Sequence, residues 1–222
     1  MKAIFYKEWI KTAGFIIVMA IVLYGIAGYV LLNINRIAEI KGVEHLWEVM
    51  ITRDVLLTDI IKYVPLLIGI LLGTAQWAPE MHRKCLKLTL HLPVSNLKTI
   101  NIMLAYGGLV LCLMFAFEFV VLLLWLSPLL PVELMRHILL TMFVWHLAGV
   151  LAYILCSWVF LDPTWRMRVV NLIVSFLLLR IFFLSDVPEA YNTILPLLTL
   201  FTILSVAFVW NSIARFKSGC QD

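Results

Sequence analysis

Long runs of apolar residues constrain this chain more than any other feature of its sequence. A helix rises about 1.5 Å per residue, so about 20 apolar residues cross a hydrocarbon core of about 30 Å. Six runs approach this length, and they cover about residues 13–34, 63–79, 101–126, 134–160, 169–184 and 193–213. Each is predicted to be a helix, because a lone strand in lipid leaves its backbone groups without hydrogen-bond partners. The predicted fold class is an all-α membrane protein with six transmembrane helices.

Composition excludes an ordinary soluble protein. Of the 222 residues, 64% are apolar and only 14% are charged, and the mean hydropathy is +1.03. These charges cannot supply a polar surface for a fold of this size. The net charge of +4 arises from short cationic clusters between the apolar runs, so we predict no nucleic-acid site. The four cysteines stand singly, without a CxxC pair or a partnered histidine, so neither a disulfide framework nor a metal site is predicted.

The cations predict the orientation of the chain. With six spans, both tails and the loops 80–100 and 161–168 share one side of the membrane. Eleven of the seventeen Lys and Arg residues lie on that side: Lys2, Lys7, Lys11, Arg83, Lys84, Lys87, Lys98, Arg166, Arg168, Arg215 and Lys217. The positive-inside rule therefore predicts a multi-pass protein of the cell (inner) membrane with both termini in the cytoplasm. Arg180, near the outer end of the fifth span, is predicted to snorkel toward lipid phosphate.

Three regions follow from this pattern. Residues 1–12 form a predicted amphipathic interfacial helix, although a basic flank that only fixes topology fits equally well. Residues 13–213 form the six-helix transmembrane domain, and residues 214–222 form a cytoplasmic tail. Between the first two spans, about residues 35–62 are predicted to lie outside and to contain a short surface helix.

The segment between the second and third spans carries the most specific pattern. Met81, Cys85, Leu88 and Leu92 follow helical spacing, and basic residues occupy the other faces, so a short amphipathic helix is predicted over about 80–92. Pro93 ends it, because proline disfavours helix in the residue before it. An ordinary basic loop would have the same composition.

The order of residues in this segment resembles that of the permease subunits of type-2 ABC exporters. The matching residues are Glu80, Arg83, Leu86, Leu88, Leu90, Leu92, Pro93, Val94, Ser95 and Lys98. Lys7-Glu8-Trp9 is similar to the lead-in on the interfacial helix of that family. The family usually has Gly-Thr just after the Arg, where this chain has Lys84-Cys85. The resemblance implies that this cytoplasmic element is a coupling helix, with ATPase contacts at Glu80, Arg83, Lys84, Lys87, Leu88, Leu92 and Pro93.

The implied function is the membrane-spanning subunit of an ATP-driven exporter that works as a dimer with a second permease copy or a related permease. The chain has no GxxxxGK[ST] loop, so it is not predicted to be an enzyme, and it binds no cofactor itself. ATP and Mg would be bound by separate ATPase subunits. A membrane scaffold or assembly factor without transport activity is the alternative, and an intramembrane enzyme is a more remote one. Residues 184–189, together with Pro196, are similar to the helical re-entry before the last span of such permeases, or form an ordinary outer loop.

Two further features lie within the apolar runs. Glu118 and His146 are predicted at similar depths on consecutive antiparallel spans, where they can pair. Such a pair could contact a polar substrate headgroup in the pathway, or it could be an interhelical hydrogen bond that holds the bundle. Gly69 and Gly73 form a GxxxG pattern, which permits close helix packing within the chain or between subunits.

Overall fold

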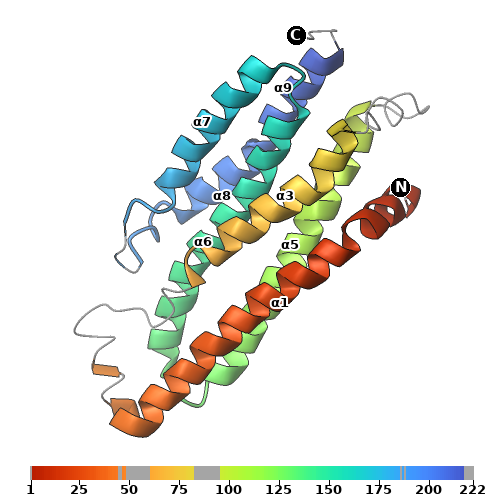
Figure 1. Ribbon diagram of the computed structural model, residues 1–222. Coiled ribbons are helices and arrows are strands. Elements are labelled where there is room, and N and C mark those ends of the chain that lie inside the picture. Colours follow the sequence, from red (N-terminus) through yellow and green to blue (C-terminus); the bar gives the residue numbers. More distant parts are fainter. Residues whose placement is uncertain are drawn as a thin grey trace.

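The computed structural model describes residues 2–44, 47–48, 61–82, 96–185, 187 and 189–217. In these residues the chain forms helices joined by turns and contains no strand (Figure 1). The helices are α1 (Lys2–Lys41), α3 (Val64–His82), α5 (Asn96–Leu126), α6 (Val132–Leu161), α7 (Trp165–Ile181), α8 (Leu195–Leu204) and α9 (Val206–Lys217). The all-α prediction is confirmed, and each predicted span coincides with a helix or, for the last, with a helix pair.

Four helical stretches are long and apolar enough to cross a membrane: α1, most of α5, α6, and the pair α8–α9 from Leu195 to Arg215. Helix α3 has 19 residues and α7 has 17. Their lengths are therefore about 29 Å and about 26 Å, slightly less than a hydrocarbon core of about 30 Å. The chain is thus a multi-pass helical membrane protein, and the count of six spans remains a prediction for α3 and α7.

Helix α1 differs from its predicted boundaries. It runs without interruption over 40 residues, so no break separates the expected interfacial helix 1–12 from the first span. A helix of this length measures about 60 Å, about twice the hydrocarbon core, and its two ends extend beyond the apolar stretch. The first residues of the predicted outer segment, 35–41, are therefore the last part of α1. Residues 43–44 and 47–48 are helical, in agreement with a short surface helix there.

The last apolar run is divided. Helix α8 ends at Leu204 and α9 begins at Val206, and the buried Ser205 between them donates from Oγ to the Thr202 carbonyl at 2.6 Å. Before α8, the described residues of 182–194 form turns and bends. No re-entrant helix occurs in that described part, so the alternative of an ordinary loop describes it better.

Helix α6 is the centre of the bundle. Its most apolar stretch is 72% buried, against 28–39% in the other three long spans. It contacts α3 and α5 as well as α7, α8 and α9, while α1 packs against α3 and α5. In Figure 1 the chain alternates between two ends of the bundle. We call the end with Lys2, His82, Asn96 and residues 162–164 the terminal end, and the end with Lys41 and residues 127–131 the loop end.

Glycines allow α3 and α6 to approach closely. A Cβ atom added to Gly69 would collide with the backbone carbonyl of Gly149, and one added to Gly73 would lie 2.8 Å from the Cβ atom of Cys156. The GxxxG pattern is therefore used inside the chain, between α3 and α6. Gly25 on α1, in contrast, has no neighbour within 4 Å of an added Cβ.

This packing predicts a difference between two glycine-to-alanine substitutions. Gly69→Ala forces α3 away from α6 and should lower the stability of the bundle by about 1–3 kcal/mol, the usual cost of overpacking. Gly25→Ala meets open space and should leave stability unchanged or raise it through the better helix propensity of alanine. Thermal unfolding of the two variants in one detergent tests this. Equal melting temperatures for both would contradict the assigned role of Gly69.

Candidate functional site

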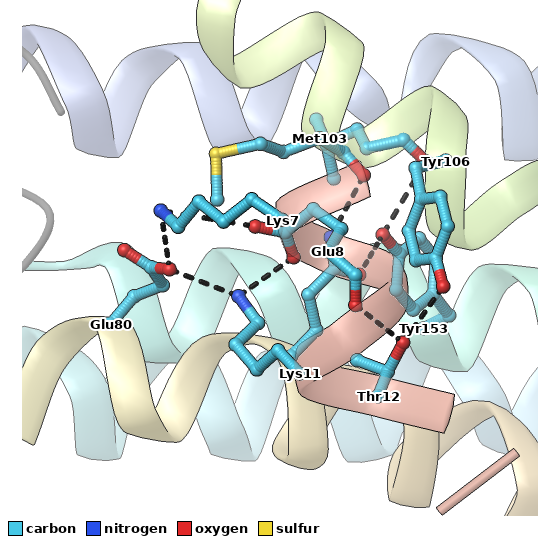
Figure 2. A network of polar contacts seen from close by, with 10 residues as sticks. Lys7, Glu8, Lys11, Thr12, Glu80, Met103, Tyr106 and Tyr153 are labelled. Carbon is cyan, nitrogen blue, oxygen red and sulfur yellow. Dashed lines mark hydrogen bonds and ion pairs between the residues drawn. The ribbon is translucent and has the colours of Figure 1, made fainter. Parts of the chain in front are cut away.

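Four charged side chains meet at the terminal end of the bundle (Figure 2). Lys7, Glu8 and Lys11 come from the first turns of α1, and Glu80 comes from the last turn of α3. The Lys7 Nζ atom lies 2.8 Å from Glu80 Oε1, and Lys11 Nζ lies 3.0 Å from the same oxygen. Lys11 Nζ also lies 2.7 Å from Glu8 Oε2. We call these four residues the ion cluster; it joins α1 to α3.

The carboxylates of the ion cluster are inside and the ammonium groups reach outward. The side chains of Glu8 and Glu80 are 0% and 2% exposed, whereas those of Lys7 and Lys11 are 41% and 16% exposed. Two positive and two negative groups balance, so no net charge is buried. A buried carboxylate is costly unless cations and hydrogen bonds compensate it, and the two lysines supply this compensation. Removing one member leaves the others unbalanced.

The two carboxyl groups respond differently to the same surroundings. Burial raises the pKa of Glu8 above its ordinary value of 4.5, and the nearby lysines only partly oppose this effect. Burial also acts to raise the pKa of Glu80, but hydrogen bonds and charge attraction from Lys7 and Lys11 outweigh it and hold that pKa below 4.5. Glu80 is therefore the stronger electrostatic partner of the two lysines.

A ladder of polar side chains continues from the ion cluster into the bundle. The Thr12 hydroxyl donates to the Glu8 carbonyl at 2.8 Å, and its oxygen lies 2.8 Å from the Tyr106 hydroxyl on α5. Since Thr12 has one hydroxyl proton, Tyr106 must donate the second bond. On the neighbouring helices, Tyr153 of α6 donates to Gln76 of α3 at 2.8 Å. This ladder gives each of α1, α3, α5 and α6 a polar contact near the same end.

The ion cluster changes the interpretation of Glu80. The sequence placed Glu80 among the ATPase contacts, but its carboxylate is buried against α1 and offers little surface to another subunit. The remaining predicted contacts lie outside the described residues: Arg83, Lys84, Lys87, Leu88, Leu92 and Pro93. They belong to the connection between the end of α3 at His82 and the start of α5 at Asn96. This connection leaves α3 three residues after the cluster.

The structure also brings Glu118 and His146 together. Glu118 Oε2 lies 2.9 Å from His146 Nε2, and both side chains are buried. The histidine ring also contacts the rings of Phe115 and Phe119, with centroids 4.8 and 4.7 Å away. Glu118 lies eight residues before the end of α5, about 12 Å along the helix, so the pair lies within the apolar stretches of α5 and α6.

The hydrogen bond of the second ring nitrogen of His146 shows where the protons of this pair lie. Nδ1 lies 2.8 Å from the Met142 carbonyl oxygen, which can only accept, so Nδ1 carries a proton. The contact between Nε2 and the Glu118 carboxyl then needs a proton of its own, on either His146 or Glu118. In both cases the pair carries no net charge, as a low-dielectric position requires. The pair can hold and exchange one proton between α5 and α6.

Sequence reasoning missed the role of Asp162. This residue lies in the turn between α6 and α7, and its carboxylate accepts from the Thr164 backbone N–H at 3.2 Å and from Arg215 Nη1 of α9 at 3.0 Å. Asn171 of α7 and Ser212 of α9 also donate to it. Aspartate two residues before threonine is typical of a turn in which the side chain bonds the backbone, and this signal was available. The partners from α9 are distant in sequence and gave no signal.

The described residues contain no group of three His, Cys, Asp or Glu side chains that could hold a metal ion. The chemistry that these sites offer is ion pairing at the terminal end and proton exchange at Glu118 and His146. Comparison with protein-family models, with curated proteins and with solved structures finds no match to this chain.

The ion cluster predicts an acid transition that depends on Glu80. Because the folded state lowers the pKa of Glu80, its stabilisation is complete above about pH 4.5 and is lost as the pH falls through the lower folded value. Glu80→Gln should lower the free energy of unfolding at pH 7 by about 1–3 kcal/mol, between the values for exposed and buried pairs. As the pH falls below that lower value, the variant and the parent protein should converge. Thermal unfolding in detergent across this pH range measures both effects.

Glu133→Gln is the matched control, because Glu133 is an exposed acid in the first turn of α6 at the other end of the bundle. It should lie close to the parent protein at every pH. A constant difference between Glu80→Gln and the parent protein from neutral to acid pH would contradict the electrostatic role of Glu80.

The Glu118–His146 pair predicts an order of stability among variants. Glu118→Gln keeps a donor for Nε2 and should cost little, whereas Glu118→Ala leaves the His146 nitrogen unpaired and should cost about 1–3 kcal/mol. His146→Ala should be similarly costly, and the double alanine variant should be less destabilised than the sum of the two. Unfolding measurements give this coupling. Additive losses would mean that the two side chains do not stabilise each other, and intact transport in destabilised variants would assign the pair a structural role.

Proposed function

We propose that this chain is the membrane-spanning permease subunit of an ATP-driven ABC exporter. Two copies, or one copy with a related permease, form the translocation pathway. Separate ATPase subunits, which bind ATP and Mg, dock on the connection between α3 and α5. The proposal combines the multi-pass helical fold with the resemblance of residues 80–98 to the coupling segment of type-2 exporters.

The observation that carries this proposal is the ion cluster. Glu80 belongs to the last turn of α3, just before the proposed docking segment, and it is bound by Lys7 and Lys11 of α1. A displacement of the docking segment would therefore act on α3 and α5 through the backbone and on α1 through charge pairs. Three helices of the bundle can thus respond to one cytoplasmic contact.

The mechanism requires that the ATPase bind the two states of the permease with different free energies. Basic residues of the docking segment would meet an acidic ATPase surface, and closure of the nucleotide sites would shift the segment and the helix ends attached to it. The ion cluster keeps α1 and α3 together in this movement. The Glu118–His146 pair lies deeper in the membrane, where it would either contact a polar part of the cargo or hold α5 to α6.

The proposed orientation follows from the cations. Lys2, Lys98 and Arg166 lie at the terminal end of the bundle together with the lysines of the ion cluster. The positive-inside rule assigns this end to the cytoplasm of the cell (inner) membrane, which is also where an ATPase must dock. The predicted topology and the proposed docking site thus assign the same end of the bundle to the cytoplasm.

A non-transporting scaffold or assembly factor is the alternative function. It would use the same buried polar contacts only for stability, and it would have no stoichiometric ATPase partner. An intramembrane enzyme based on Glu118 and His146 would instead lose turnover when either residue is replaced while the fold persists.

Purification of the tagged chain from its host in gentle detergent tests the proposal. We expect a stoichiometric partner that carries a P-loop and whose ATPase activity changes when it binds this chain. Arg83→Glu combined with Lys87→Glu should weaken that association about tenfold, since the reversal of two charge attractions loses about 1.4 kcal/mol. Arg166→Glu, on the exposed start of α7 at the same end, is the control and should retain the partner. An intact chain that repeatedly lacks such a partner would favour the scaffold.

A further inference from the structure

A wide apolar groove opens on the membrane-facing side of the bundle. Helix α6 lines its floor, α5 lines one wall and α8 lines the other, and the enclosed volume is about 760 Å³. Most of its lining is aliphatic or aromatic, as in Phe119, Leu139 and Phe143. Its size is within the range of pockets that hold drug-sized ligands.

The threonines and the histidine along the groove offer no free polar atom to an occupant. Thr199 and Thr202 of α8 donate their hydroxyl protons to carbonyls of the same turn, those of Pro196 and Leu198, each at 2.8 Å. Both ring nitrogens of His146 are occupied as well, by the Met142 carbonyl and by Glu118. An occupant of the groove must therefore be apolar along most of its length.

One charged group stands at the loop end of this groove. Arg136, in the second turn of α6, lines the groove and is exposed. Within the described part of the chain its side chain makes no ion pair or hydrogen bond, and this includes Glu133 one turn before it. A guanidinium group beside an apolar surface can bind an anion, and its planar donors suit a phosphate.

The distance along the groove fits one leaflet of a bilayer. From Arg136 to Val150, which lines the opposite part of the groove, α6 advances about 21 Å. Half of a hydrocarbon core measures about 15 Å, so the groove accommodates an acyl chain that descends from the level of the headgroups. Arg136 therefore lies where the headgroup of a lipid would be, and the apolar part of the groove lies where its acyl chain would be.

We propose that this groove binds an anionic phospholipid from the leaflet at the loop end of the bundle. One acyl chain lies between α5 and α8 against α6, and the phosphate of the headgroup meets Arg136. The lipid fills a gap between α5 and α8 that the chain itself leaves open. This site is independent of the proposed exporter function, since it involves neither the ion cluster nor the docking segment.

The test compares two arginines at the same end of the bundle. Arg180, near the end of α7, is also exposed, and its side chain makes no ion pair or hydrogen bond in the described part of the chain, but it does not line the groove. The protein is incorporated into nanodiscs with equal amounts of phosphatidylglycerol and phosphatidylcholine, and the lipid that stays bound after extraction in mild detergent is counted by native mass spectrometry. We expect one phosphatidylglycerol to be retained in preference to phosphatidylcholine.

Arg136→Gln should lower the retention of phosphatidylglycerol about fivefold, since one cation near a lipid surface contributes about 1 kcal/mol. Arg180→Gln should leave retention unchanged. Ala116→Trp, which fills the groove from α5 and keeps Arg136, should also lose the lipid. Retention by all three variants, equal loss in the two arginine variants, or no preference between the two lipids would overturn the proposal. Melting temperatures of the variants verify that each remains folded, and none of these outcomes bears on ATPase binding.

Discussion

The close crossing of α3 and α6 determines how the other helices can be arranged. Glycines at positions 69 and 149 bring the two backbones together, and the Tyr153 side chain of α6 can then reach Gln76 on α3. Because α6 is enclosed on this side by α3 and α5, α7, α8 and α9 must pack on its other surface. In lipid, helices gain little from burying apolar surface against each other, so close packing and buried hydrogen bonds carry much of the specificity. The bundle has both at this crossing.

The positions of the polar residues follow the free-energy cost of burying them. The four charged groups of the ion cluster lie at the terminal end, where Lys7 and Lys11 extend to water, while the Glu118–His146 pair, which lies deeper in the bundle, carries no net charge. A charge cluster of this kind deeper in the bilayer would need far more compensation than two lysines provide. The ion cluster is therefore suited to link helices at the surface of the membrane. The Glu118–His146 pair, which carries no net charge, is suited to link helices inside it.

The helices could be predicted from the sequence because a segment in lipid must be long and apolar and must satisfy its backbone hydrogen bonds internally. Such apolar segments are detected directly by hydropathy. The pairing of Glu118 with His146 followed from depth alone, since few other polar groups were available at that level. Hydropathy could not indicate that α1 continues from Lys2 to Lys41, because polar helix ends resemble loops in composition. Nor could it indicate that Glu80 is buried, since its partners are about seventy residues away in the sequence and no local pattern reports them.

A chain of contacts extends from the ion cluster to the Glu118–His146 pair along α1 and α5. Tyr106 of α5 donates to Thr12, and farther along the same interface the Tyr24 hydroxyl of α1 donates to the Met114 carbonyl at 3.2 Å. The Tyr24 ring also packs edge-on against Phe117, the residue before Glu118, with centroids 5.1 Å apart. A shift of α1 along α5 must break both hydrogen bonds and this ring contact together. Small displacements at the terminal end would thus be carried along α5 as a unit, and they would act on the buried hydrogen bonds of α5 to α6, which involve Leu104 near that end and Glu118 deeper in the bundle.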